Sequence, residues 1–223
     1  MVARIAWWIA RLVILFILLS LILVLAYRFV PVPYTLTMAF DENTVTKDWT
    51  PLSRIDRNMV SAVIAAEDSK FCEHDGFDTE AIEEALEERA EGKRQRGAST
   101  ISQQTAKNVF LWQDGGWFRK GLEAWFTFLI ENIWDKRRIM EVYLNVAETG
   151  IGTYGAEAGT QRYFGHTAAR LSRSEAARIA AVLPSPKTRE AVNPTGFTRR
   201  YGNTIAARIG VVRRDGLDSC VYD

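Results

Sequence analysis

The chain has 223 residues, and its 28 lysines and arginines nearly balance its 27 aspartates and glutamates, giving a formal net charge of +1. This balance argues against a nucleic-acid partner, because proteins that bind nucleic acid concentrate basic charge on one face. A hydrophobic share of 48% and a charged share of 25% are those of a packed protein and exclude disorder over most of the length. Two cysteines and two histidines are too few for a disulfide scaffold or a multi-histidine metal centre.

The first thirty residues differ in composition from the rest and predict a membrane helix. No charged residue occurs across residues 12–27, and with three more residues the stretch approaches the ~30 Å thickness of the hydrocarbon core. Arg4 and Arg11 precede it, so the positive-inside rule places the N-terminus in the cytoplasm, although Arg28 reduces the asymmetry. A cleaved signal peptide is the alternative, but no small-x-small cleavage sequence follows the apolar run. We therefore expect residues 1–30 to be an uncleaved anchor.

Beyond the anchor, the periodicity predicts an almost wholly helical domain. Pro31 and Pro33 end the anchor helix, and residues 34–47 alternate polar and apolar residues like an extended tether or short strand. We expect a linker over residues 31–48 and one domain over residues 49–223. Helices are expected over about residues 55–67, 78–91, 99–110, 117–133, 135–147, 172–183 and 198–213. Strand signals are too scattered for a sheet of any size, so the fold class is mainly α with a small β element near the tether.

Three of the expected helices carry cap signals at their start. Asp78 precedes the second domain helix, and either Ser99 or Thr100 can cap the third. Ser172 and Glu175 form a capping box that opens the helix ended by a proline at position 184.

Two adjacent carboxylates, Glu67 and Asp68, end the first domain helix. A charged helix end is ordinarily solvated, but Glu67 follows Val63 and Ile64 by four and three residues, so it lies on or beside the buried face. A carboxylate against an apolar wall has its charged form disfavoured, which tunes a glutamate for proton transfer. Phe71 is the candidate for that wall.

A loop of small residues leads into the third domain helix. Free backbone donors at such a helix start, with hydroxyls and Lys107 two turns on, favour an anion such as phosphate. A simple helix cap is the commoner role of Ser99 and Thr100. Gln104 and Asn108 follow Thr100 on the same helical face. The Gly-Lys-Ser/Thr ending of a P-loop is missing.

Arg119, Lys120 and Glu123 are charges on a helix that is otherwise apolar and rich in Trp and Phe. The i,i+4 spacing of Arg119 and Glu123 fits an ordinary surface ion pair. In the alternative, the cations face a diphosphate and Glu123 holds a metal ion or a cation. The surplus of aromatic residues exceeds what a core stripe needs, so we expect part of this helix to dip into the outer leaflet of the membrane.

The fifth domain helix carries a further polar group. Arg137 and Glu141 are four residues apart, and packing and solvation explain most of that pattern. Tyr143 and Asn145 precede a glycine-rich loop, where we expect them to form the polar lining of a cleft.

Together these four groups resemble the motif set of the peptidoglycan glycosyltransferases. The matching stretches are Glu-Asp-x-x-Phe-x-x-His-x-Gly at 67–76, Gly-Ala-Ser-Thr-Ile-Ser-Gln-Gln at 97–104, Arg-Lys-x-x-Glu at 119–123 and Lys-x-x-Ile-x-Glu-x-Tyr-Leu-Asn at 136–145. The resemblance extends from Trp49 to Arg214, with Ala98 and Ser102 where the family often has glycine and threonine. No Ser-x-x-Lys plus Lys-Thr-Gly set of a penicillin-binding domain is found, so the chain resembles the monofunctional members.

The resemblance implies a lysozyme-like helical fold and polymerisation of lipid II into β-1,4-linked glycan strands, with release of undecaprenyl diphosphate. It assigns Glu67 as general base of an inverting displacement and Glu123 as a second catalytic carboxylate. A divalent cation, Mg or Mn, is expected near Glu123, and no organic cofactor. Substrate contacts are expected from Asp68, Phe71, His74, Ser99, Thr100, Gln104, Lys107, Asn108, Arg119, Lys120, Glu141, Tyr143 and Asn145.

The same resemblance gives the expected surroundings of the protein. Lipid II, the nascent glycan strand and the membrane are the expected partners, with division or elongation proteins as further candidates and no nucleic acid. The expected location is the bacterial inner membrane, with a single span, a cytoplasmic N-terminus and a periplasmic catalytic domain. The sequence itself does not show whether Cys72 and Cys220 meet; an oxidising compartment permits a disulfide between them, but we do not expect one.

Two other functions stay open at this point. A cell-wall hydrolase on the same kind of fold also needs one glutamate in an apolar cleft, but it needs neither the cations around Lys107 and Arg119 nor a membrane-facing aromatic helix. A membrane-anchored scaffold for the division or elongation machinery predicts that Glu67 and Glu123 are replaceable without consequence.

Overall fold

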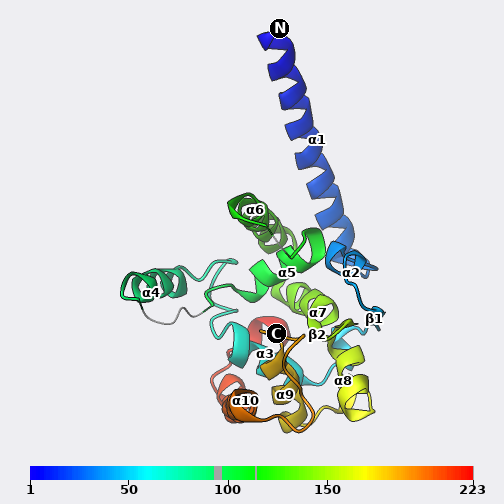
Figure 1. Ribbon diagram of the computed structural model, residues 1–223, viewed down its shortest axis with the longest axis vertical. Coiled ribbons are helices and arrows are strands. Elements are labelled where there is room, and N and C mark those ends of the chain that lie inside the picture. Colours follow the sequence, from blue (N-terminus) through cyan, green and yellow to red (C-terminus); the bar gives the residue numbers. More distant parts are fainter. Residues whose placement is uncertain (93–96, 114, 223) are drawn as a thin grey trace.

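The computed structural model describes residues 1–92, 97–113 and 115–222. The long helix α1 (Val2–Phe29) stands out from a mainly helical domain (Figure 1). The other helices are α2 (Leu36–Ala39), α3 (Arg57–Glu67), α4 (Thr79–Ala90), α5 (Ile101–Phe110), α6 (Trp117–Ile133), α7 (Lys136–Val146), α8 (Ala156–Phe164), α9 (Arg173–Val182), α10 (Gly196–Arg214) and α11 (Ser219–Tyr222), with 3-10 turns at Leu52–Arg54 and Ala168–Arg170. The expected fold class is confirmed: a mainly α, lysozyme-like domain follows a single N-terminal apolar helix.

Helix α1 is long and apolar enough to cross a membrane, and it is the one such helix among the described residues. Most of its side chains are exposed, and only Ser20 and Val24 are buried. A helix that presents apolar side chains outward all round is a span rather than a core helix. The apolar helix expected at the N-terminus is therefore present, as a candidate membrane span.

The cap signals of the sequence are confirmed. Asp78 accepts a hydrogen bond from a backbone N–H in the first turn of α4. Thr100, rather than Ser99, caps α5, and Gln103 completes a capping box there. Ser172 and Glu175 form the expected capping box of α9.

The linker differs from the expected extended tether, because it contains α2. Thr35 Oγ1 accepts a hydrogen bond from Met38 N at 3.3 Å, and Met38 is buried. Capping and burial of one apolar side chain therefore stabilise a single turn that alternation alone does not reveal.

A sheet of very short strands closes the domain on the side of the linker. Its strands are β1 (Thr46–Lys47), β2 (Glu148–Gly150) and β3 (Thr153–Tyr154), in the order β1-β3-β2. The pair β1–β3 is parallel and the pair β2–β3 antiparallel. The small β element expected near the tether is therefore present, and it attaches the linker to the domain.

The core lies between α3, α5, α7, α9 and α10. Helix α3 is buried on nearly every side from Met59 to Ala65 and packs against both α9 and α10. By contrast, no described residue of α4 is buried, and the helix projects from the body (Figure 1). The rigid part of the fold is thus the part that carries the end of α3, where Glu67 lies.

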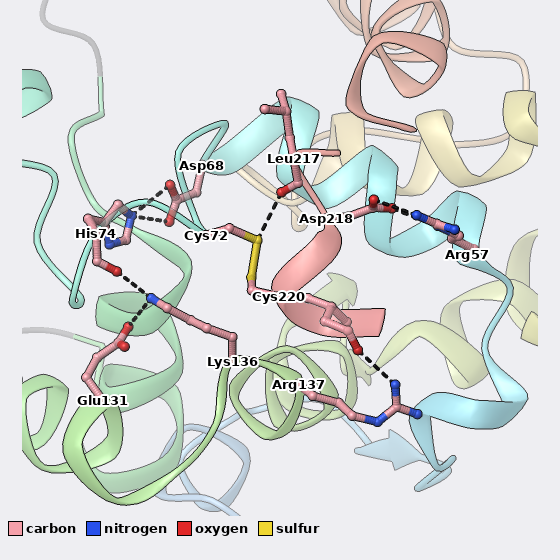
Figure 2. The surroundings of a disulfide bond; sticks show 11 residues. Arg57, Asp68, Cys72, His74, Glu131, Lys136, Arg137, Leu217, Asp218 and Cys220 are labelled. Carbon is pink, nitrogen blue, oxygen red and sulfur yellow. Dashed lines mark hydrogen bonds and ion pairs between the residues drawn. A yellow bond between two sulfur atoms is a disulfide. The ribbon is translucent and has the colours of Figure 1, made fainter. Parts of the chain in front are cut away.

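The expectation that the two cysteines stay unpaired is wrong. Cys72 and Cys220 form a disulfide, with Cα atoms 5.5 Å apart despite a sequence separation of 148 residues (Figure 2). Helix α11 packs on α7 and thereby brings Cys220 beneath the loop that contains Cys72. Only the tertiary fold creates this proximity.

Candidate active site

Glu67 is the last residue of α3, and its carboxylate is only partly satisfied. Its Oε2 accepts a hydrogen bond of 2.9 Å from Gln104 Nε2. Its Oε1 is buried and has no hydrogen-bond partner among the described residues. Burial raises the pKa of Glu67, and the neighbouring Asp68 adds to the rise, whereas Gln104, Arg189 and Lys107 oppose it. The group has the partly desolvated character that suits a proton acceptor.

The segment that follows Glu67, residues 68–76, is here called the site loop. Asp68 Oδ2 accepts a hydrogen bond of 3.0 Å from Ile101 N, at the start of α5, where a negative charge is favoured. His74 Nε2 lies 3.0 Å from Asp68 Oδ1. Because Gly76 N donates to His74 Nδ1, the ring proton is on Nε2 and is donated to Asp68. Asp68 and His74 therefore tie the site loop to α5.

The site loop ends at a glycine that the backbone requires. Gly76 has φ +91°, and a Cβ atom there would lie 2.8 Å from both Glu131 Cγ and Thr127 Cγ2. We expect Gly76→Ala to lower the free energy of unfolding by about 2–4 kcal/mol, from left-handed strain plus overpacking. Chemical denaturation measures this, and Gly165→Ala is the matched control. Gly165 has φ +70° but open space around it, so about 1 kcal/mol is expected there. Equal losses in the two variants would contradict the steric part of the argument.

Phe71 does not form the expected wall at Glu67. It is fully buried and faces Lys136, whose Nζ lies 4.7 Å from the ring centroid. Lys136 Nζ also donates to His74 O at 2.6 Å and pairs with Glu131 at 2.8 Å (Figure 2). The side chain of Phe71 therefore fixes the underside of the site loop, and it is not among the residues that line the cavities near Glu67.

Two small cavities lie at the site. One, of about 140 Å³, is lined by Glu67, Asp68 and the loop that includes Ser99 and Thr100. The other, of about 180 Å³, is lined by side chains of α5, α7 and β2, among them Gln104, Lys107, Asn108, Tyr143 and Glu148. Tyr143 Oη donates to Gln104 Oε1 at 3.3 Å, so Gln104 connects Tyr143 to Glu67.

Some polar side chains at the start of α5 and along it are engaged in hydrogen bonds within the protein, whereas Lys107 has no such bond to the described residues. Thr100 Oγ1 donates to Gly76 O at 2.7 Å and caps the helix, so its hydroxyl is engaged. Asn108 Oδ1 accepts from Gln113 Nε2 at 3.3 Å. Lys107 Nζ makes no hydrogen bond or ion pair with the described residues. Lys107 is therefore the cation of α5 that faces a cavity without a local partner.

Glu123 holds two cations in a buried cluster rather than on the surface. It is 3% exposed, its Oε2 lies 2.7 Å from Arg119 Nη1, and its Oε1 binds Lys120. Burial lowers the pKa of Lys107. The positive charges of Arg119 and Lys120 lower it further, whereas the negative charges of Glu123 and Glu67 oppose the change. Lys107 is thus electrostatically coupled to both glutamates, which are 56 positions apart in the sequence.

The donor set at Glu123 does not fit a metal ion held by the protein. Both carboxylate oxygens are already bound to cations. Across the described parts of the chain, no group of three or more His, Cys, Asp or Glu side chains is arranged to hold a metal. The divalent cation expected from the family resemblance therefore stays a prediction from the sequence.

Two residues expected at the site hold the start of the domain instead. Glu141 Oε1 accepts from Leu52 N at 3.0 Å, and its Oε2 pairs with Arg138 at 2.7 Å rather than with the expected i−4 arginine. Asn145 bonds both the N–H and the C=O of Thr50, at 2.8 and 2.9 Å. Neither side chain is among those that line the two cavities, because each is engaged by the backbone that enters the domain.

Sequence reasoning missed a larger groove of about 850 Å³ beside the second cavity. It is lined by residues of the linker, the end of α5 and the loop after α9: Thr37, Phe40, Asp41, Trp112, Gln113, Glu148, Tyr154, Ser185, Pro186, Lys187 and Thr188. Tyr154 Oη donates to Asp41 at 2.6 Å. Burial alone raises the pKa of Asp41, but the hydrogen bonds from Tyr154 and Asn43 outweigh it and lower the pKa to about 2. Because these segments are far apart in the sequence, no local motif reveals the groove.

Arg189 is the second element that the sequence reasoning missed. Its Nη1 donates to Ala181 O at 2.9 Å, and its charge favours the ionised form of Glu67. Lys187 and Arg189 follow Pro184 and Pro186. The available signal in the sequence was two cations that closely follow a pair of prolines.

Helix α6 lies alongside the C-terminal half of α1. Trp125 Nε1 donates to Ser20 Oγ at 3.1 Å, and Trp134 Nε1 donates to Val24 O at 2.8 Å. The rest of α6 presents large aromatic side chains outward, namely Trp117, Phe118 and Phe128. The helix that carries these exposed aromatic side chains therefore packs beside the anchor helix α1, and the ribbon view shows α6 next to it (Figure 1).

A helical domain behind one apolar helix, with a buried glutamate set among cations, is the architecture of a membrane-anchored glycosyltransferase. A family model described as "Transglycosylase" matches residues 35–209, and the chain belongs to that family. Proteins described as "Biosynthetic peptidoglycan transglycosylase" are similar over most of their length. The one from Caulobacter vibrioides is 51% identical over 201 residues, which cover 89% of this chain and 88% of the relative. Those from Rhodospirillum centenum and Bdellovibrio bacteriovorus are 50% and 49% identical, covering 92% and 91% of this chain and 91% and 86% of the relatives.

Proposed function

We propose that this glycosyltransferase of peptidoglycan synthesis polymerises lipid II into β-1,4-linked glycan strands and releases undecaprenyl diphosphate. Glu67 takes the proton of the acceptor 4-hydroxyl as the oxygen attacks the donor anomeric carbon, and the diphosphate leaves with the bonding electron pair. One displacement on an α-linked donor gives a β bond, so no sugar–enzyme intermediate forms. The observation that carries the proposal is the buried Oε1 of Glu67, which lacks a hydrogen-bond partner among the described residues beside a cavity.

Cations near Glu67 support the departure of a diphosphate. Lys107 faces the neighbouring cavity without a described partner, and Glu123 orients Arg119 and Lys120. Preorganised positive groups stabilise negative charge that develops on a leaving group. A wall hydrolase, whose leaving group is a sugar hydroxyl, has no need of this cluster.

The aromatic surface supports a site at the bilayer. Because Ser20 of the anchor contacts Trp125, the adjoining part of α6 lies at the depth of the membrane segment. We therefore place Trp117 and Phe118 in the outer leaflet, where a lipid-linked substrate reaches the site laterally. The Cys72–Cys220 disulfide favours an oxidising compartment for the domain, which supports a periplasmic domain, an inner-membrane anchor and a cytoplasmic N-terminus. Contacts with division or elongation proteins stay a prediction.

The test compares two substrates with the purified full-length protein. Lipid II in detergent micelles is expected to yield glycan chains, separable by length on a gel, whereas polymeric wall is expected to release no soluble fragments. Release of fragments from polymeric wall without polymerisation of lipid II would establish the hydrolase instead. Addition of a chelator in a parallel reaction tests the predicted divalent cation.

A further inference from the structure

The disulfide lies directly behind the site loop. Cys72 is four residues after Asp68, and Cys220 is in α11, near the C-terminus (Figure 2). We propose that Cys72 and Cys220 are positioning residues for glycosyl transfer: their disulfide fixes the site loop against α11 and so holds Glu67 and Asp68 in their working positions. This inference rests on the proposed function, because it takes Glu67 as the reacting group.

The end of the chain is anchored to the core independently of the disulfide. Asp218 is fully buried and forms a bidentate pair with Arg57, at 2.7 and 2.9 Å, and Ser61 Oγ donates to it at 3.1 Å. Arg137 Nη1 donates to Val221 O at 2.8 Å. Because Arg57 and Ser61 are on α3 and Arg137 is on α7, the segment around Cys220 is fixed to the two helices that carry much of the site.

The site loop is held near both ends by hydrogen bonds, packs on the domain through the buried Phe71, and carries the disulfide in its middle. Asp68 is held by Ile101 N, and the carbonyl of His74 is held by Lys136. Between them, Cys72 Sγ is bonded to Cys220 and lies 3.1 Å from Leu217 O, a contact without a hydrogen bond, since a disulfide sulfur carries no proton.

The direction of the Glu67 carboxylate depends on this loop as well as on the buried helix α3. Its carboxylate has a single described hydrogen bond, from Gln104, so side-chain contacts alone do not fix it. Its C-terminal neighbour, Asp68, begins the site loop, and α3 continues no further. Movement of the loop therefore changes both the direction of Glu67 and its access to water. A misplacement of about 1 Å at a reacting group lowers a rate by as much as 100-fold.

Reduction breaks one S–S bond and forms two thiols, which take up two electrons and two protons from an added dithiol; the dithiol becomes a cyclic disulfide. In the cell the reverse step transfers two electrons and two protons from the thiols to a protein disulfide oxidant. The cysteines are half-buried, so a small dithiol reaches them from one side.

The experiment compares the oxidised protein, the dithiol-reduced protein and the C72S/C220S variant, full-length in detergent with lipid II. We expect reduction and the variant each to lower kcat about tenfold, with KM changed less than twofold. Because burial raises the pKa of Glu67, entry of water moves the acid limb of the kcat–pH profile to lower pH. Thermal denaturation of each form confirms that the assays are run on folded protein. The D218N variant, which loosens the end of the chain with the disulfide intact, is expected to shift the profile in the same direction by less.

Several results overturn the inference. Free thiols in protein taken from membranes, shown by alkylation and mass measurement, would exclude the cross-link. Equal kcat and identical pH profiles for the oxidised and reduced protein would show that the loop needs no such tether. Loss of activity when dithiol is added to C72S/C220S would trace the effect to the reagent. The proposed function is tested separately: it falls if the oxidised wild-type protein does not polymerise lipid II, and the role of Glu67 falls if E67Q polymerises lipid II normally.

Discussion

Glu67→Gln is expected to lower the rate of lipid II polymerisation by about 1,000-fold, the magnitude typical of a missing general base. Gln is isosteric and keeps the hydrogen bond to Gln104 through its amide oxygen, so the geometry of the site is preserved. It does not accept a proton from a hydroxyl at neutral pH. The initial rate of glycan formation at saturating lipid II measures the loss as a change in kcat. Glu73→Gln, an exposed change in the same loop, is the control and is expected to leave the rate within about twofold.

Although Glu67→Gln is expected to lower activity, it is expected to maintain or raise the stability of the fold. Burial raises the pKa of Glu67 in the folded protein above its unfolded value of 4.5. The folded state therefore retains its proton to higher pH, and ionisation of Glu67 costs stability as pH rises from 4.5 through the folded pKa. At neutral pH, Glu67→Gln removes this cost, so its melting temperature is expected to equal or exceed that of the wild type. A marked fall in melting temperature would show that the ionised carboxylate stabilises the fold and would contradict the desolvated state assigned to it.

The raised pKa of Glu67 also predicts how the polymerisation rate of the wild-type protein depends on pH. Polymerisation requires ionised Glu67, so the rate falls as pH falls through its raised pKa. The acid limb is thus expected above pH 4.5 rather than at it. A kcat–pH profile that stays flat down to pH 4.5 would assign the proton transfer to another group.

The helices and their caps were accessible from the sequence because their determinants are local. The apolar run of residues 12–27, the Ser172 capping box and the aromatic helix Trp117–Ile133 each depend on residues within a few turns of one another. Helix α8 escaped prediction, because its sequence, AEAGTQRYF, has no clear apolar stripe. The strand pair of Thr46 with Thr153 depends on contacts more than 100 positions apart.

For the candidate site too, features set by local sequence could be predicted, and features set by long-range contacts could not. Glu67 was identified because its spacing from Val63 and Ile64 places it beside a buried face, which is a local property. The hydrogen bonds of Asn145 and Glu141 to the backbone of Thr50 and Leu52 could not be predicted, since these partners are about 90 positions away. Pairing of the cysteines likewise needed the packing of α11 on α7. Polar residues in a motif therefore indicate that a site exists, whereas which of them reach the substrate is decided by long-range contacts.

Glu123→Gln is expected to lower both stability and activity, because Glu123 is the buried anion that neutralises Arg119 and Lys120. Removing one partner of a buried pair costs about 3–5 kcal/mol. Since the Lys120 side chain is 43% exposed and screened by solvent, about 2–3 kcal/mol is expected here. Chemical denaturation measures this loss, and Glu83→Gln on the exposed helix α4 is the matched control, with a change within about 0.5 kcal/mol.

The kinetic signature of Glu123→Gln separates a cation-orienting carboxylate from a metal ligand. Loss of the anion leaves Arg119 free to move, so kcat is expected to fall about 100-fold. It also makes the cluster around Lys107 more positive, which favours the diphosphate of the ground state, so KM is expected to stay constant or fall. If Glu123 were a metal ligand, we would instead expect excess Mg²⁺ or Mn²⁺ to restore the rate of the variant. Such rescue would return Glu123 to the metal site expected from the sequence, because a carboxylate that only orients two cations has no property that added metal restores.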